Sequence, residues 1–325
     1  WSTIASFNLV LHNSKRTLHP AAWWTSHQAM RFIRELKPDI LHLDDPDTSL
    51  RLALDIFELG RIPLVLNVHD PTPHSGEHNW RKTAARKLIF PHVHHFVLHN
   101  KDQAEAFRRV NHVSHDRVSV LHLGSYDIYK EWGSEPVAQE KNTVLFFGRL
   151  SPYKGLEVLY DAIQRVAAQV PDVRLVVAGS RASKYIPPSP PVLHRGGTIE
   201  LIENYISNSQ LTKLFQQATV VVCPYLDATQ SGVVLTAYAF DRPVVATSVG
   251  GIPEYVSERV TGLLVPPDNP SALAAALVEI LSDADLRNIL CKGIQSQSAG
   301  SLGWGQVARK ALDMYERVLA RAPRS

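Results

Sequence analysis

Short apolar runs alternate with amphipathic segments along almost the whole chain, and no other feature limits the possible fold as strongly. The run 143–147 has the length and branched residues of a buried strand, whereas 156–170 places apolar residues at helical spacing. Strands that alternate with helices in this way predict an α/β fold, in which helices cover both faces of a parallel sheet. The other predicted strands cover 40–43, 64–68, 95–98, 118–121, 173–178, 219–223, 243–247 and 262–265, and the other predicted helices cover 26–36, 49–59, 79–89, 101–110, 208–217, 232–240, 271–281 and 283–290.

The alternation occurs in two halves, which a polar segment over 129–142 separates. A chain of 325 residues is long for one hydrophobic core and has room for two domains. We therefore expect one domain over 1–135 and another over 142–303. A final helix over 304–325 follows a bend rich in glycine and serine, and it could pack back on the N-terminal domain.

Composition and charge exclude several classes of protein. A net charge of +3 is too small to argue for nucleic acid, and no apolar run reaches the roughly 18–20 residues that cross a bilayer. Two cysteines, Cys223 and Cys291, imply no disulfide framework and fit a reducing, cytoplasmic compartment. Histidines gather before residue 125, but neighbours such as His94 and His95 lie in a strand-like stretch and point to opposite faces. We therefore expect no metal site.

Two cations follow a predicted strand in the second half. The strand ends at Gly148, which lets the backbone turn and lets a ligand approach closely. Arg149 and Lys154 then flank a turn before the next helix, where they could hold a pyrophosphate through charge-assisted hydrogen bonds worth about 1.5–3 kcal/mol each. The alternative is that both cations are ordinary solvated surface residues.

A second candidate anion site lies in 223–254, the stretch CPYLDATQSGVVLTAYAFDRPVVATSVGGIPE. It contains a strand end, a polar loop, a helix and a second strand, followed by a turn at Gly250 and Gly251 that opens a further helix. Loops at the carboxyl ends of strands lead into helix N-termini, whose unpaired N–H groups suit phosphate. This turn therefore favours a functional role for Arg149 and Lys154.

The motifs FGRLSPYKGLEVL, VVVCPY, AFDRPVVATSVGGIPEYV and TGLLVPPDNPSAL occur in this order and resemble the C-terminal domain of retaining glycosyltransferases of family 4. The resemblance covers most of 143–305 and implies a GT-B fold, in which two Rossmann-like domains with parallel sheets face each other across a cleft. It implies that the C-terminal domain binds a UDP- or GDP-sugar and that the N-terminal domain binds the acceptor. No metal or cofactor is implied, because an arginine and a lysine neutralise the phosphates in this family. These two residues match Arg149 and Lys154.

The loop after 223 departs from the family pattern. Relatives usually carry two glutamates eight residues apart, which contact the donor sugar and the ribose, and these positions hold Ala228 and Thr236 here. Losing one ribose contact should cost about 1–3 kcal/mol, which the two phosphate cations can outweigh. Gln230 and Ser231 could supply hydrogen bonds to the sugar instead. The N–H groups available to the distal phosphate are those of Ser231, Gly232 and Val233.

The resemblance implies further contacts. Tyr205 and Ile206 lie in the segment that passes the nucleobase in relatives, and Glu254 is either a polar contact to the donor or an ordinary carboxylate at a helix N-terminus. His69 follows a predicted strand. In relatives, a histidine after the matching strand lies near the acceptor or the transferred sugar. His69 would orient the sugar rather than act as a strong base, and the alternative is a histidine that only caps the strand. The other acceptor-side candidates are Asp70, His74 and His122.

The predicted helix 79–89 has a basic face. Such faces suit anionic lipid head groups, and many relatives act at membranes on lipid-linked acceptors. A solvated basic face is the alternative. We expect a cytoplasmic protein that could contact the inner face of the membrane through Arg81, Lys82, Arg86 and Lys87.

The beginning of the chain also departs from the family. Relatives start with a strand and a Gly-Gly loop that reaches toward the donor phosphates, whereas no such loop precedes Trp23 and Trp24. The first residue is Trp1 rather than Met, and no signal peptide is visible. We expect the first strand and its loop to lie upstream of Trp1 or to be absent.

These features predict a retaining, metal-independent hexosyltransferase that moves a sugar to a glycan or lipid-linked acceptor in polysaccharide or glycolipid biosynthesis. The alternative is a catalytically silent GT-B protein that binds a nucleotide, a glycan or a partner, since both loop glutamates are missing. Another GT-B chemistry, such as sugar-nucleotide epimerisation, lacks motif support. The sequence names neither the sugar nor the acceptor.

Overall fold

The structure, a computed structural model, describes residues 20–44, 62–69, 71, 80–132, 135–182 and 185–321. Its contacts group the chain into two compact units. The first unit holds the chain up to Leu98, together with Asn111–Ser119 and Leu312–Ser325, and the second holds His99–Val110 and Val120–Ala311. The limits predicted for the two domains, 1–135 and 142–303, stay a prediction.

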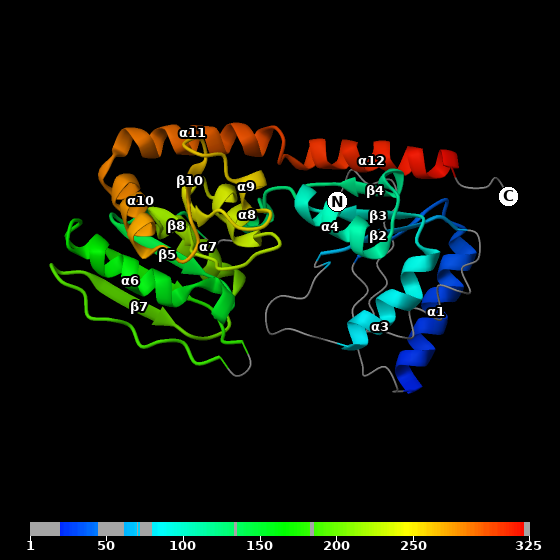
Figure 1. Ribbon diagram of the computed structural model, residues 1–325, viewed down its shortest axis with the longest axis horizontal. Coiled ribbons are helices and arrows are strands. Elements are labelled where there is room, and N and C mark those ends of the chain that lie inside the picture. The colour runs from blue at the N-terminus through cyan, green and yellow to red at the C-terminus, as the bar shows by residue number, and fades with distance from the viewer. Residues whose placement is uncertain are drawn as a thin grey trace. The chain divides into compact units, whose positions relative to one another are not determined.

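The first unit is built on a four-stranded sheet in the order β1-β2-β3-β4, of which Figure 1 labels β2, β3 and β4. Its strands pair in parallel where the register is defined, with Val65 of β2 opposite His42 of β1 and His95 of β3. All four residues of β3 are buried, so side chains on both of its faces are covered. The strands are β1 (Leu41–Leu43), β2 (Leu64–Asn67), β3 (His95–Leu98) and β4 (Val118–Val120), and the accompanying helices are α1 (Pro20–Leu36), α3 (Trp80–Ile89), η1 (Phe90–His92) and η2 (His115–Arg117). The helix α4 (Lys101–Asn111) follows β3 in the chain, but all of its residues except Asn111 belong to the second unit.

The second unit is built on a six-stranded, all-parallel sheet in the order β10-β9-β8-β5-β6-β7. After β5 the chain adds β6 and β7 on one side, and it then crosses to the other side of β5 to add β8. The carboxyl ends of β5 and β8 are therefore a topological switch point, where open α/β sheets bind ligands. The strands are β5 (Thr143–Phe147), β6 (Arg174–Ala178), β7 (Thr198–Ile202), β8 (Val220–Cys223), β9 (Val244–Thr247) and β10 (Gly262–Val265).

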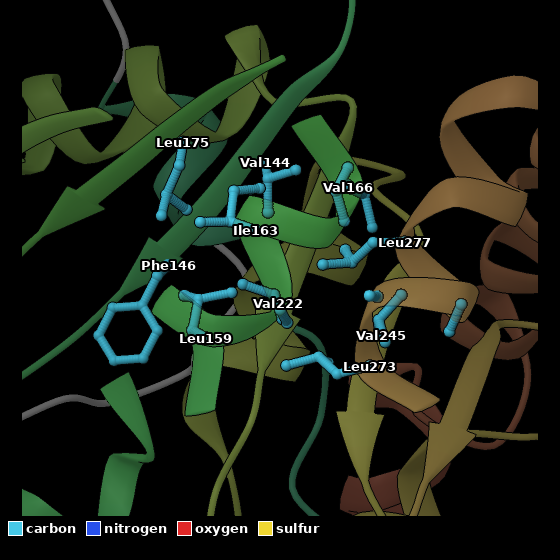
Figure 2. Packing of buried hydrophobic residues seen from close by; sticks show 14 of the residues in the cluster. Val144, Phe146, Leu159, Ile163, Val166, Leu175, Val222, Val245, Leu273 and Leu277 are labelled. Carbon is cyan, nitrogen blue, oxygen red and sulfur yellow. The ribbon is translucent and has the colours of Figure 1, made fainter. Parts of the chain in front are cut away.

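Helices cover both faces of this sheet. Successive side chains of β5 alternate between two hydrophobic clusters, because Val144 and Phe146 belong to one cluster and Leu145 belongs to the other. Figure 2 shows the first cluster, in which Leu159 of α6 and Leu273 of α10 pack toward the strands. The helices are α5 (Ile128–Glu131), η3 (Pro152–Lys154), α6 (Leu156–Ala167), α7 (Asn208–Gln217), α8 (Gly232–Ala239), α9 (Ile252–Tyr255), α10 (Pro270–Ser282) and α11 (Ala284–Ala299). The last helix, α12 (Trp304–Arg321), begins in this unit and belongs to the first unit from Leu312 on.

The predicted α/β fold with two parallel sheets is confirmed. The edge strand β7 is missing from the predicted strands because its side chains are exposed or half-buried, so its sequence TIELI has no continuous apolar run. The predicted helix 49–59 lies outside the described residues. Within the part of the chain that the structure describes, no helix has the length and apolar character needed to cross a bilayer.

Candidate functional site

The loop after β5 brings two predicted cations to the switch point. Gly148 has a φ of +119°, a value that favours glycine, and the exposed Arg149 follows it. The chain then forms η3, which ends at the half-buried Lys154. Gly155 has a φ of +69°, and a Cβ there would lie 1.9 Å from the carbonyl oxygen of Pro224. The β5 loop therefore lies directly against the loop that follows β8.

Lys154 is a cation with no anionic partner among the described residues. It forms no ion pair with any described residue, and its Nζ lies 3.6 Å from the ring centroid of Tyr225 and 5.3 Å from that of Tyr153. Burial lowers the pKa of Lys154 to about 8, and the positive charge of Arg149 acts in the same direction, whereas Cys223 opposes it. A phosphate would supply the counter-charge that this ammonium lacks.

The N-terminus of α8 lies at the end of the same β8 loop. Ser231 caps the helix, because its Oγ accepts a hydrogen bond of 3.4 Å from the N–H of Val234. Ser231 is buried, while Gln230, Gly232 and Val233 are half-buried. The unpaired N–H groups of the first turn suit an anion, as the sequence predicts.

Gly250 and Gly251 pack closely against the backbone of this loop. Gly250 has a φ of +50°, and a Cβ there would lie 1.6 Å from the carbonyl oxygen of Ala228. The N–H of Gly251 donates a hydrogen bond of 3.2 Å to the carbonyl of Thr229. The helix that they open, α9, has only four residues. The structure thus gives these glycines a supporting contact with the loop, and their contact with a phosphate stays a prediction.

The two positions that hold glutamates in relatives carry small side chains that turn inward. Ala228 is 6% exposed, and the Thr236 hydroxyl donates a hydrogen bond of 2.8 Å to the carbonyl of Gly232 within α8. Neither side chain can replace a carboxylate at this loop.

The structure brings together two residues that the sequence assigns to opposite substrates. His122 Nε2 lies 2.8 Å from Glu254 Oε2, and both side chains are largely buried. Glu254 Oε1 also accepts a hydrogen bond of 2.6 Å from the N–H of Lys101, at the start of α4. Glu254 therefore caps α4 and pairs with His122, two contacts that the sequence did not predict, and its contact with the donor stays a prediction.

Asn100 is a site residue that sequence analysis missed. Its side chain is fully buried, and its Nδ2 donates a hydrogen bond of 2.7 Å to the carbonyl of Thr229 in the β8 loop. Its Oδ1 accepts from the N–H of Gln103, so Asn100 is also the N-cap of α4. An asparagine before a predicted helix indicates such a cap, but its contact with a loop 129 residues away has no local signal.

His69 lies in the first unit, at the carboxyl end of β2. Its Nε2 is 2.6 Å from Asp44 Oδ1, the oxygen that also accepts a hydrogen bond of 3.2 Å from Asn67 Nδ2. The next residue in this network is His42, whose Nε2 lies 3.0 Å from Asn67 Oδ1. His69 is thus oriented by a carboxylate. Asp70 and His74 lie outside the described residues.

The predicted nucleobase segment follows β7. Tyr205 is 81% exposed, which leaves its ring available to a ligand, and Ile206 is half-buried. A capping box between Ser207 and Gln210 at the start of α7 fixes the end of the segment. Contact of this segment with a base stays a prediction.

The predicted basic face lies on α3. Lys87 is exposed, and the guanidinium of Arg86 donates a hydrogen bond of 3.5 Å to the carbonyl of Pro71. The side chains of Arg81 and Lys82 lie outside the description. Among the described residues, no three side chains of the kinds that bind metals converge.

Comparisons with known proteins agree with this architecture. A family model described as Glycosyltransferase Family 4 matches residues 7–125, and one described as Glycosyl transferases group 1 matches 141–283. A glycosyltransferase of Methanocaldococcus jannaschii is 27% identical over 299 residues, which cover 86% of this chain and 75% of the relative. The D-inositol 3-phosphate glycosyltransferase of Corynebacterium glutamicum is 25% identical, over 81% of this chain and 68% of the relative. The crystal structure of Anabaena HepE in complex with UDP-glucose superposes with a TM-score of 0.70 at 18% identity, over 92% of this chain and 84% of HepE.

Proposed function

Since this chain belongs to the glycosyltransferases of group 1 and family 4, we propose that it transfers a sugar from a nucleoside-diphosphate sugar to a glycan or lipid-linked acceptor. We propose further that the transfer retains the configuration of the sugar and needs no metal ion. The observation that carries the proposal is the half-buried ammonium of Lys154 beside Arg149 at the switch point, which forms no ion pair with a residue that the structure describes. Two cations of this kind can neutralise a diphosphate in place of a metal.

In the proposed reaction, groups of the chain itself stabilise the leaving group. As the bond between the anomeric carbon and the phosphate oxygen breaks, negative charge grows on the diphosphate. Lys154, Arg149 and the first N–H groups of α8 would stabilise that charge. The departing phosphate oxygen would take the acceptor proton on the same face, which retains configuration. His69, held by Asp44, would orient the sugar rather than remove a proton.

The donor class follows from the relatives. HepE binds UDP-glucose, so we propose a UDP-sugar as the first donor to test and a GDP-sugar as the second. The exposed ring of Tyr205 and the backbone of Ile206 would contact the base, and Gln230 would contact the sugar. The polar contacts at the ribose must differ from those of relatives, because Thr236 has replaced a carboxylate there.

One observation favours a second candidate function. Both glutamate positions are filled by small side chains, and the hydroxyl of Thr236 is used within α8. The loss of both carboxylates is consistent with a protein that binds the donor without turning it over, or that binds a glycan or a partner. Donor binding and transfer must therefore be measured separately.

Calorimetry with UDP, GDP and their sugars tests binding, and sugar release or transfer to acceptor extracts tests turnover. We expect Arg149→Ala and Lys154→Ala each to weaken UDP binding about tenfold or more, whereas Lys213→Ala, at an exposed lysine of α7, should leave it unchanged. Turnover should survive EDTA. Unaltered UDP binding in both cation variants would show that the phosphates bind elsewhere.

We also propose that the protein acts in the cytoplasm and contacts anionic membrane surfaces through α3. Lys87 is exposed on this helix, and the sequence predicts that Arg81, Lys82 and Arg86 contribute to the same basic face. Co-sedimentation with vesicles that contain phosphatidylserine should decrease when these four cations are replaced by glutamine. Binding that persists in this variant would remove α3 from the membrane contact.

A further inference from the structure

Tyr225 lies between the two parts of the candidate phosphate site. It follows β8 after a single proline, and its side chain is 1% exposed. Its carbonyl accepts a hydrogen bond of 2.6 Å from Thr247 Oγ1, which fixes its backbone to β9. One face of its ring meets the ammonium of Lys154, with Nζ 3.6 Å from the ring centroid. Its hydroxyl lies 3.4 Å from the hydroxyl of Ser231, the cap of α8.

The groups that face Lys154 carry no negative charge at neutral pH. They are the thiol of Cys223 on β8, the guanidinium of Arg149, and the rings of Tyr153 and Tyr225. Burial raises the pKa of the Cys223 thiol and raises that of the Tyr225 hydroxyl well above its usual value, so both groups stay neutral. The electron-rich face of Tyr225 is therefore the closest favourable partner of this ammonium in the described residues.

An aromatic ring suits a lysine that must later bind phosphate. A carboxylate would hold the ammonium firmly, but it would cancel the positive charge and repel an incoming diphosphate. A ring attracts the ammonium through its quadrupole and leaves its charge and its hydrogen-bond donors available. Because the hydroxyl of the same side chain reaches Ser231, Tyr225 can fix the distance between the lysine and the start of α8.

We propose that Tyr225 is the positioning residue of the phosphate site. Its ring holds the Lys154 ammonium, and its hydroxyl holds Ser231, the cap of α8. This inference rests on the proposed function of the site as the one that binds the donor diphosphate. It assigns a role to the tyrosine that ends the motif VVVCPY.

The test replaces Tyr225 in the full chain by phenylalanine and then by 4-fluoro-, 3,5-difluoro- and 3,4,5-trifluorophenylalanine. Fluorination withdraws electrons from the ring face while it changes the ring's volume little. The pKa of Lys154, followed by NMR of the isotopically methylated lysine, should decrease stepwise by about half to one pH unit across the series. The pH at which UDP affinity is lost should decrease by the same amount. The same fluorinated residues at Phe240, a nearly buried ring of the same core cluster, should shift neither quantity.

Two further variants separate ring from hydroxyl. Tyr225→Phe should keep the pH profile of UDP binding, since the ring remains. Tyr225→Leu should weaken UDP binding about tenfold at pH 8, and circular dichroism checks that it is folded.

A Lys154 pKa and a UDP affinity that stay constant across the fluorinated series would overturn the inference and leave Tyr225 as a residue that only fills space. A wild-type protein that binds no nucleoside diphosphate would instead overturn the proposed function. In that case the titration of Lys154 without ligand would still decide whether the ring holds the ammonium.

Discussion

Replacing Lys154 by methionine should weaken donor binding and, at the same time, stabilise the protein without ligand. The folded structure lowers the pKa of this lysine from 10.5 to about 8, which corresponds to roughly 3 kcal/mol against the charged form. Part of the side chain still contacts solvent, so we expect Lys154→Met to raise the free energy of unfolding by about 1–2 kcal/mol at pH 7. The missing charge-assisted contact should cost about 1.5–3 kcal/mol of UDP binding, or roughly ten- to 150-fold in Kd.

The dependence of stability on pH gives the sharper test. Below pH 8 the lysine is charged in the folded and the unfolded chain, and the full penalty is present. Between pH 8 and 10.5 the folded protein loses this proton while the unfolded chain keeps it, so the penalty disappears. Urea unfolding should therefore show the advantage of Lys154→Met at pH 7 and a much smaller one near pH 10.5.

Lys213→Met provides the matched control, because Lys213 is an exposed lysine of α7 in the same unit. It should change neither UDP binding by calorimetry nor the pH dependence of unfolding. The reasoning is refuted if Lys154→Met destabilises the protein at pH 7, or if its effect on unfolding is the same at both pH values. Either result would mean that the ammonium is already neutralised in the folded protein.

Three further predictions concern the same parts of the molecule. The wild-type UDP affinity should be constant between about pH 6.5 and 7.5 and decrease above pH 8, because Lys154 loses its proton there; a constant affinity up to pH 9.5 by calorimetry would contradict this. Gly250→Ala should destabilise the protein by roughly 2–4 kcal/mol and weaken UDP binding, since its Cβ would lie 1.6 Å from a backbone oxygen. Gly305→Ala is the control for thermal unfolding and should be neutral or stabilising, because a Cβ there meets nothing within 4 Å. Asp44→Asn should lower the turnover of the donor about tenfold without changing its Kd, because it removes the carboxylate that orients His69; unchanged turnover would separate this pair from the reaction.

The strands of the second sheet could be predicted with good accuracy because they are buried on both faces. In β5 both alternating sets of side chains enter hydrophobic clusters, so the whole run is apolar and stands out from the sequence. The edge strand β7 has only partial cover and alternates apolar with polar residues, which removes this signal. In this sheet the sequence therefore predicted the strands that helices cover on both faces and missed the edge strand, which solvent reaches.

The candidate site shows the same division. The positions of Gly148, Arg149 and Lys154 follow from local sequence, because a strand end, a glycine and two cations are adjacent in the chain. The residues that these side chains contact cannot be predicted from the local sequence. Tyr225 reads as the end of an apolar run, and its contact with Lys154 exists only because β8 lies next to β5 in the sheet.

The sequence by itself determined the α/β class and the resemblance to a family, and it predicted the two cations proposed to bind phosphate, since each of these depends on residue types at short spacing. Only the tertiary structure decided what surrounds the cations. It placed an aromatic ring rather than a carboxylate against Lys154, paired His122 with Glu254 and brought Asn100 to the carbonyl of Thr229. Contacts between residues that lie far apart in the sequence leave no periodicity in the chain, because the packing of strands and helices, and not local propensity, brings them together.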